Sequence, residues 1–156
     1  NSRDFNLEGA GIRAATMRGS YVPSKSFDGT IAYFNGDRES FTSTSDGDAE
    51  SAPNLTLVAG TYAGLRADNQ TITMTVDSTG TLSGHSTDGC TVAGTLCPRG
   101  KGNVFHTSVT FGAEACRQGN ETLTGVALYD AATQRLYSAA LNPARTTSYL
   151  FLGTKR

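Results

Sequence analysis

A short sequence motif of glycine and threonine recurs along this chain and constrains its fold more than any other feature. Glycine, threonine, one or two apolar or hydroxyl residues and a second glycine stand at residues 60–64 and 80–84, and partial copies occupy residues 29–31, 94–96 and 122–125. Threonine is β-branched and favours the pleated surface of a sheet, whereas glycine marks turns, bulges and tight corners. A chain punctuated in this way is expected to form a series of short antiparallel strands.

The strongest local signal is the pair Asn35-Gly36, which separates two β-like segments at residues 28–34 and 37–44. Both central residues of a type I′ turn need positive φ angles, which Asn-Gly accommodates well. The pair therefore predicts a hairpin with a two-residue turn. Residues 12–21, just before it, are expected to form a further strand, although Ala14-Ala15 would also suit a helix.

The pattern becomes regular in the second part of the chain. Apolar residues alternate with threonines over residues 71–76, which indicates a half-buried strand with a threonine-lined outer face. Residues 123–129 are expected to pair with residues 134–141. The last strand, at residues 148–152, is apolar on both faces and is therefore expected to be central or covered on both sides.

These signals predict an all-β protein, an antiparallel meander that forms a small β-barrel or β-sandwich of about 8–11 short strands with little or no helix. A polar, acidic stretch at residues 43–54 divides the chain. We expect an N-terminal β-meander at residues 1–53, packed on or continuous with the main body, and a main antiparallel barrel or sandwich at residues 54–156.

Charge and hydropathy exclude several classes of partner. Charged residues make up 17% of the chain and nearly cancel, to a net charge of −1. This balance provides no electrostatic footprint for nucleic acid or for an anionic membrane surface. No run of about 18 apolar residues is present to span a bilayer. Few lysines and many threonines, serines, glycines and asparagines are typical of an exported β-protein, which we expect to be monomeric.

Neither histidine lies in a recognisable catalytic or metal-binding motif. His85 precedes Ser86 and Asp88, but residues so close in sequence rarely form a nucleophile–base–orienter relay, and no G-x-S-x-G motif occurs. His106 lies within an expected strand and is interpreted as a surface or barrel-lining residue. No C-x-x-C pair indicates a zinc site. We therefore expect no catalytic, cofactor-binding or metal-binding residues, and a protein that is not an enzyme.

The three cysteines, Cys90, Cys97 and Cys116, leave at least one thiol unpaired in a monomer. Cys90 and Cys116 both lie next to expected turns, where a bridge between them would link two strand ends. A short bridge between Cys90 and Cys97, or three reduced thiols, are the alternatives.

The chain has no tryptophan, so tyrosine and phenylalanine must supply its bulky side chains. They could fill the core, or they could line a cavity, because barrels of about eight strands are just wide enough for one small ligand. The candidate lining residues are Tyr62, Phe105, Phe111, Tyr129, Tyr137 and Phe151.

Several phrases of the sequence resemble a family of uncharacterised small envelope lipoproteins, or surface antigens, of beta-proteobacteria. They are DFNLEG at residues 4–9, GTYAG at 60–64, the glycine-cysteine segment at 89–95, GNVF at 102–105, VTFG at 109–112, the long segment at 129–146 and FLGTK at 151–155. The resemblance covers nearly the whole chain and is strongest from residue 60 onward.

The resemblance implies export to the outer membrane or periplasm, with host factors or other envelope components as partners. In similar proteins a lipidated cysteine and a further β-rich segment usually precede the part that matches this chain, so membrane attachment is expected only through an anchor outside it. Similar proteins keep the cysteines that match Cys90 and Cys116, which supports that pairing and leaves Cys97 as the odd thiol. No catalytic residue is implied.

Two functions follow as expectations. The first is a non-enzymatic exported protein of the cell envelope. The alternative is a β-barrel that binds a small apolar molecule.

Overall fold

The computed structural model describes residues 2–5, 12–45, 47, 50–66, 70–112 and 115–156. The chain forms two compact units, Asn1–Glu50 and Ser51–Arg156. The boundary between them, after Glu50, lies within the polar stretch at residues 43–54. Both units are built from antiparallel strands. The all-β fold expected from the sequence is therefore correct.

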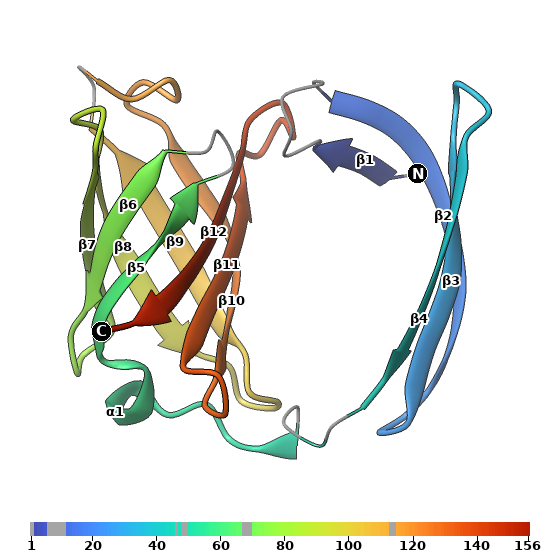
Figure 1. Cartoon of the computed structure of the whole chain (residues 1–156), viewed down its shortest axis with the longest axis horizontal. Coiled ribbons are helices and arrows are strands. Elements are labelled where there is room, and N and C mark those ends of the chain that lie inside the picture. The colour runs from blue at the N-terminus through green and yellow to red at the C-terminus, as the bar shows by residue number, and fades with distance from the viewer. Residues whose placement is uncertain (1, 6–11, 46, 48–49, 67–69, 113–114) are drawn as a thin grey trace. The chain divides into compact units, whose positions relative to one another are not determined.

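The N-terminal unit is a four-stranded antiparallel meander with the order β1-β2-β3-β4 (Figure 1). Its strands are β1 at Ser2–Phe5, β2 at Ile12–Val22, β3 at Ser26–Tyr33 and β4 at Arg38–Thr44. The strand expected at residues 12–21 is thus present as β2. Because the meander is open, β1 and β4 are its two edges.

The turn between β3 and β4 differs from the expected type I′ turn. The Gly36 N–H donates to the Tyr33 carbonyl at 3.0 Å, and the Tyr33 N–H donates to the Asp37 carbonyl at 2.9 Å. Gly36 has a φ of 98°, whereas Asn35 is not among the residues with positive φ. The connection is therefore a three-residue loop built on a type I turn that ends in a left-handed glycine.

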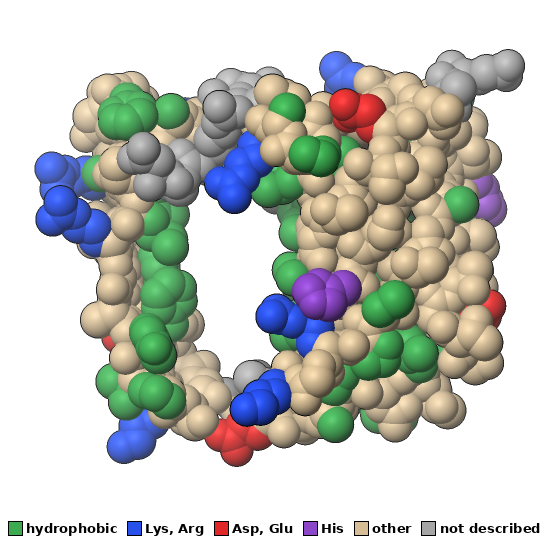
Figure 2. Space-filling model, turned by 180° about the vertical axis from the view of Figure 1, so that it is seen from behind, with side chains coloured by type: hydrophobic (Ala, Val, Ile, Leu, Met, Phe, Trp, Pro, Cys, Tyr) green, Lys and Arg blue, Asp and Glu red, His purple; other side chains and the backbone are tan. Residues whose placement is uncertain are grey.

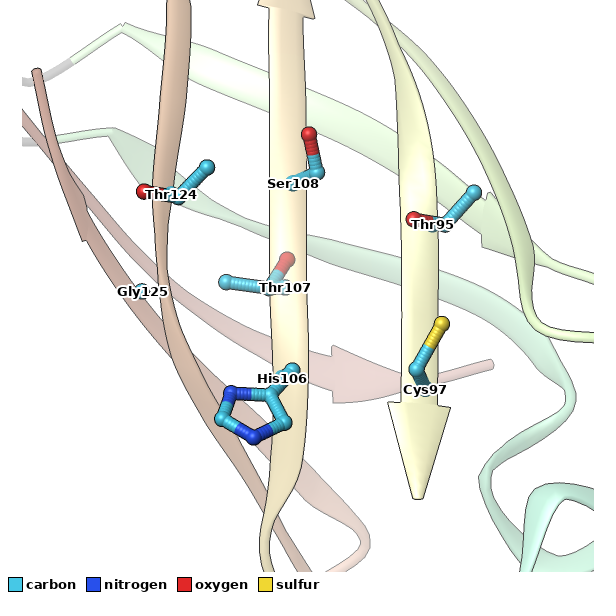
Figure 3. A pocket seen from close by; sticks show the side chains of 7 residues that line it. All are labelled: Thr95, Cys97, His106, Thr107, Ser108, Thr124 and Gly125. Atoms are coloured by element: carbon cyan, nitrogen blue, oxygen red, sulfur yellow. The ribbon is translucent and has the colours of Figure 1, made fainter. Parts of the chain in front are cut away.

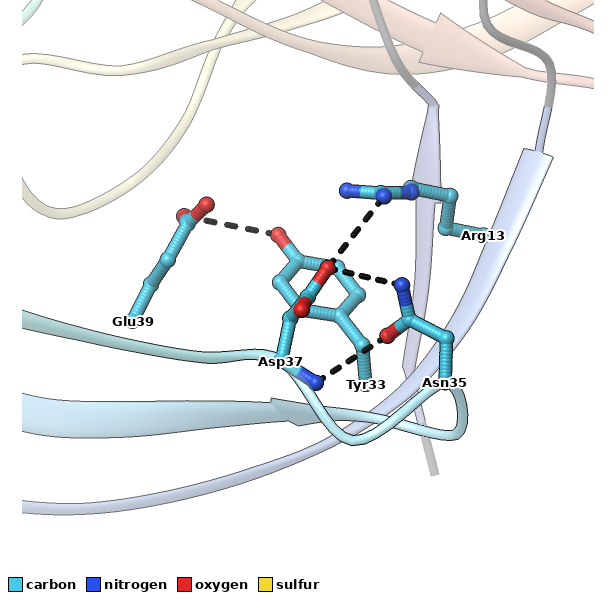
Figure 4. Close-up of polar contacts among 5 residues, drawn as sticks. All are labelled: Arg13, Tyr33, Asn35, Asp37 and Glu39. Carbon is cyan, nitrogen blue, oxygen red and sulfur yellow. Dashed lines mark hydrogen bonds and ion pairs between the residues drawn. The ribbon is translucent and has the colours of Figure 1, made fainter.

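Side-chain hydrogen bonds explain this turn (Figure 4). The Asn35 carbonyl oxygen accepts from the Asp37 N–H at 3.1 Å, and its amide donates to the Asp37 carboxylate at 2.7 Å. Asn35 uses its side chain to close a local turn on the residue two positions later, which competes with the backbone geometry of a type I′ hairpin. Arg13 reaches the same carboxylate at 3.4 Å.

One face of the N-terminal sheet is apolar. The register places Met17 opposite Ile31 and Tyr21 opposite Phe27, and alternation directs all four to the same face. On the left of Figure 2, hydrophobic side chains gather along this sheet. The Phe41 ring covers Gly29, where an added Cβ would lie 2.6 Å from the ring. The apolar face consists of Ala15, Met17, Tyr21, Phe27, Ile31, Tyr33 and Phe41.

The C-terminal unit is a closed up-and-down barrel, which decides between the barrel and the sandwich that the sequence left open. Each strand pairs with its neighbours in sequence, and β12 returns to pair with β5 (Figure 1). The strands are β5 at Gly60–Arg66, β6 at Thr71–Val76, β7 at Thr81–Ser86, β8 at Thr91–Pro98, β9 at Phe105–Phe111, β10 at Thr122–Asp130, β11 at Arg135–Leu141 and β12 at Ser148–Lys155.

Buried and exposed side chains alternate along the barrel strands as the pattern of apolar and polar residues predicts. On β6 the apolar residues Ile72, Met74 and Val76 are buried and the threonines between them face outward. The expected pairing of residues 123–129 with 134–141 is confirmed by β10 and β11. The last strand, β12, is paired on both sides, but Leu152 on its outer face is 42% exposed. The strand is therefore central, which is one of the two arrangements expected from the sequence, and its outer face is not covered.

The described α-helix is the four-residue α1 at Leu55–Val58, and Glu50 adds one described residue of 3₁₀-helix. The Asn54 side chain caps it by accepting from the N–H groups of Thr56 and Leu57 at 2.9 and 3.3 Å. The Tyr62 hydroxyl donates to the Val58 carbonyl at its end. No described helix has the length and apolar character needed to cross a membrane.

Candidate functional site

The aromatic residues considered as cavity lining pack against one another inside the barrel. Tyr62, Phe105, Phe111 and Phe151 are fully buried, and Tyr129 is nearly so. Two edge-to-face contacts involve members of this set. The rings of Tyr62 and Tyr129 lie 6.2 Å apart at 80°, and those of Phe111 and Tyr149 lie 5.5 Å apart at 71°. Such contacts are typical of a filled core.

The assignment of Tyr137 to the interior is wrong. Tyr137 faces outward from β11, with Leu136 buried beside it. The register of β11 places Leu136 and Ser138 on the inner face, and side chains alternate strictly between the two faces of a strand. Tyr149, which the sequence analysis did not select, takes an interior position on β12. The sequence feature that could have indicated Tyr149 is the stretch at residues 148–152, which is apolar on both faces. For that reason it did not reveal which of its residues point inward.

The environment of Tyr62 favours the protonated form of its phenol. Burial raises the pKa of Tyr62 well above its ordinary value, and the neighbouring Tyr129 raises it further. The phenol therefore stays protonated at neutral pH and remains a donor to the Val58 carbonyl. Tyr62 is a structural anchor between β5 and α1.

Two hydroxyls in the barrel wall face its interior. Thr107 on β9 and Ser138 on β11 are buried, and neither side-chain oxygen makes a hydrogen bond to the described residues. On β10 each lies opposite a small residue, Thr107 opposite Gly125 and Ser138 opposite Ala127, whereas their partners on the other side are Leu96 and Phe151. These two hydroxyls are interior polar positions at which another group could be bound.

The neighbouring residues His85, Ser86 and Asp88 do not form a catalytic relay. His85 faces outward from β7, whereas Ser86 is buried on the opposite face. The Ser86 hydroxyl donates to the Asp88 carboxylate, which also accepts the Cys90 N–H at 3.1 Å. Ser86 and Asp88 thus close the turn before β8. Over the described ranges, no group of three His, Cys, Asp or Glu side chains is placed to hold a metal ion.

The disulfide joins Cys90 and Cys116, with a Cα–Cα distance of 4.7 Å. This pairing was favoured by the sequence and supported by the resemblance, and it excludes the Cys90–Cys97 bridge and the fully reduced chain. The bond ties the start of β8 to the segment that follows β9. Cys97 is the free thiol and is exposed.

An open depression lies on the outer surface of β8, β9 and β10, with a volume of about 470 Å³ (Figure 3). Cys97 and His106 lie directly opposite each other in the register of β8 and β9. The other contributors are hydroxyl-bearing side chains and backbone, but apolar atoms make up most of the exposed lining of the depression. It is lined by Thr95, Cys97, His106, Thr107, Ser108, Thr124 and Gly125. Sequence reasoning missed it because it depends on the register of three strands.

Beside this depression the outer surface becomes apolar. Leu128 on β10 lies opposite Tyr137 on β11, Tyr137 lies opposite Leu152 on β12, and Leu152 lies opposite Leu65 on β5. These four residues, here termed the apolar row, are between 36% and 54% exposed. Val126 continues the apolar surface toward the depression, where it lies opposite His106. A contiguous exposed apolar surface of this kind is typical of an interaction site.

The arrangement of these residues provides a packed interior and an outer surface that carries an open depression and, beside it, the apolar row. No protein-family model matches the chain, and neither curated proteins nor solved structures give a significant match to it.

Proposed function

We propose that this chain is a non-enzymatic exported protein of the cell envelope, and that it binds a protein partner, an envelope component or a host factor, through the outer surface of its barrel. One observation carries the proposal. The interior aromatics are buried against one another, whereas the apolar row stands exposed across four neighbouring strands.

The composition of the apolar row supports a protein partner. Tyr137 lies between Leu128 and Leu152 in the register, so an aromatic ring with a polar tip is flanked by aliphatic side chains. Tyrosine is enriched among residues that dominate binding energy, particularly where surrounding contacts exclude water. Polar residues of the depression border the apolar surface at Val126, as polar rims border the apolar cores of interfaces.

Export is supported by the disulfide, because such bonds persist in oxidising compartments and are rare in the cytosol. The test is thiol labelling in intact cells of the producing organism, with a maleimide that does not cross membranes. We expect Cys97 alone to react before reduction, with Cys90 and Cys116 reacting after reduction and unfolding. Labelling of all three cysteines without reductant, or none in intact cells, would contradict export to an exposed oxidising site.

The binding surface is tested by affinity capture from envelope fractions and from host serum or cell extracts. The double variant Tyr137→Ser/Leu152→Ser should lose most of the captured protein, with an unchanged far-ultraviolet circular dichroism spectrum. The matched control is Thr75→Ala/Ser83→Ala, which alters outward positions on β6 and β7, across the barrel from β11. If both double variants capture the same proteins in the same amounts, the apolar row is not the binding surface.

The alternative function, a barrel that binds a small molecule, is favoured by one observation, the buried hydroxyls of Thr107 and Ser138. Native mass spectrometry of the protein purified from its own producer distinguishes the two. A co-purifying mass that disappears in Thr107→Val/Ser138→Ala would establish the alternative and overturn a purely protein-binding role.

A further inference from the structure

The β4 strand is one edge of the N-terminal sheet, and no described strand pairs with its outer side. It pairs with β3 one residue to one residue, from Ser26 opposite Thr44 to Ala32 opposite Arg38, so no bulge interrupts it. Its sequence contains no proline and no lysine, and its last five residues, 40–44, carry no charge. Natural sheets normally protect their edges with proline, with lysine or other charged residues, or with bulges. The β4 edge therefore has the features of a strand that accepts another strand.

The hydrogen-bond pattern identifies which backbone groups point outward. The Tyr33 N–H donates to the Asp37 carbonyl at one end of the β3–β4 pair, and the Ser45 N–H donates to the Lys25 carbonyl at the other, at 2.9 and 2.7 Å. In an antiparallel pair, hydrogen-bonded positions alternate with positions whose backbone groups point away. The backbone N–H and C=O groups that point to the open edge therefore belong to Arg38, Ser40, Thr42 and Thr44.

These four residues can pair with the same four residues of a second copy. In an antiparallel register with Phe41 on a two-fold axis, Ser40 lies opposite Thr42 of the second copy, and Arg38 lies opposite its Thr44. All outward-pointing backbone groups of β4 then bond in both chains. Glu39 lies opposite Ser43, so no like charges meet. Shifting this register by two residues in either direction leaves one or more of these groups unpaired.

Side chains also match in this register. The Phe41 rings of the two copies would lie side by side on the apolar face, each already in contact with Phe27 of its own sheet at 5.0 Å. Hydroxyls would meet hydroxyls on the other face, because Ser40 and Thr42 are exposed there. Aromatic pairs and hydroxyl pairs across strands are both stabilising. The apolar face would continue from one copy into the next.

We propose that β4 is a dimerisation edge, at which two copies of this chain form a continuous antiparallel sheet with Phe41 on the two-fold axis. This goes beyond the proposed function, which concerns the barrel, and it departs from the monomer expected from the sequence. A homodimer of this kind is isologous, so one variant alters both sides of the interface.

The first test is sedimentation velocity of the full chain from micromolar to millimolar concentration, with Cys97→Ser as the background to prevent adventitious bridges. We expect the mass to double as the concentration rises. Ser40→Lys/Thr42→Lys should abolish the dimer, because each introduced lysine faces one of the second copy. Ser40→Lys/Thr42→Glu, its matched control, should retain it, because each lysine faces a glutamate.

The second test fixes the register by oxidative cross-linking in the same background. Residues at position 41 form a non-hydrogen-bonded pair, with Cα atoms about 4.5 Å apart, which is within the range of a disulfide. Phe41→Cys should therefore give a covalent dimer. Glu39→Cys lies on the same face of the same strand, but its counterpart is four residues away along the partner strand, and it should not cross-link.

The outcomes are decisive because neither test depends on the partner of the barrel. A chain that stays monomeric at millimolar concentration overturns the proposal, as does a dimer that both double variants retain. Equal cross-linking by Phe41→Cys and Glu39→Cys overturns the register. Capture of an extended segment of another protein by a monomeric chain would assign the edge to that protein instead. Circular dichroism of each variant verifies the fold.

Discussion

The carbonyl oxygen of Ala139 on β11 lies 1.9 Å from the position that a Cβ atom on Gly125 of β10 would occupy. No side chain fits between these strands without moving backbone. We predict that Gly125→Ala lowers the free energy of unfolding by at least about 2 kcal/mol, measured by urea denaturation. Gly100→Ala is the control, because nothing lies within 4 Å of its added Cβ. Equal stability of the two variants would contradict this explanation of the close strand approach.

Truncation of two adjacent residues of β12 is predicted to lower the free energy of unfolding by very different amounts. Phe151 is fully buried in the barrel, so Phe151→Ala should cost about 3–5 kcal/mol through lost burial and a cavity. Leu152 faces outward, and Leu152→Ala should change stability by less than about 1 kcal/mol. Chemical denaturation monitored by circular dichroism compares them. Similar losses in both variants would show that the outer face of β12 is covered in solution.

The Cys90–Cys116 bond is predicted to contribute substantially to stability. It closes a loop of 26 residues, for which restriction of the unfolded chain is worth about 3 kcal/mol. Cys90→Ala/Cys116→Ala should lower the free energy of unfolding by about this amount. Cys97→Ser, which removes an exposed thiol, should leave it unchanged. A Cys97→Ser variant as unstable as the double variant would indicate that Cys97 takes part in the native disulfide chemistry.

Two aspartates in hairpin turns are predicted to make the barrel less stable in acid. The Thr79 hydroxyl lowers the pKa of Asp77, with further hydrogen bonds from the Thr81 and Thr79 backbone, and the Thr133 hydroxyl and N–H lower that of Asp130. Because each pKa is lower in the folded than in the unfolded chain, the stabilisation is complete above the unfolded value, about 3.9. It is lost as the pH falls through the folded values.

The test compares unfolding of the wild type with that of Asp77→Asn/Asp130→Asn from pH 6 to pH 2. Asparagine keeps a side-chain acceptor in each turn but does not titrate. We expect the stability advantage of the wild type to be greatest at pH 6 and to shrink steadily below pH 4. A constant difference across this range would mean that neither carboxylate is stabilised in its charged form.

Local patterns accounted for much of the fold. Alternation over residues 71–76 predicted which side chains of β6 are buried, and turn residues separated β10 from β11 in the expected hairpin. The prediction of a type I′ turn at Asn35-Gly36 was wrong because the Asn35 side chain accepts a backbone hydrogen bond from Asp37. A preference of the dipeptide for one turn type does not reveal such a bond. The prediction that Tyr137 lies inside the barrel was wrong because the residue type alone does not show which face of its strand a side chain is on. The register of the strand decides this.

The candidate surfaces required still more of the tertiary structure. The apolar row takes one residue from each of β10, β11, β12 and β5, which are up to 87 residues apart between Leu65 and Leu152. The depression likewise joins three strands, and Cys97 meets His106 only through their register. Spacing in the sequence carries no information about such neighbours.

The sequence by itself determined that this chain is a succession of antiparallel β-hairpins, because β-branched alternation and turn residues act over a few positions. Only the tertiary structure decided that β12 meets β5 to close a barrel, that the aromatics fill it, and that leucines and a tyrosine align on its outside. Closure and register are set by the pairing of distant backbone groups and the packing of one shared core, which no local segment specifies.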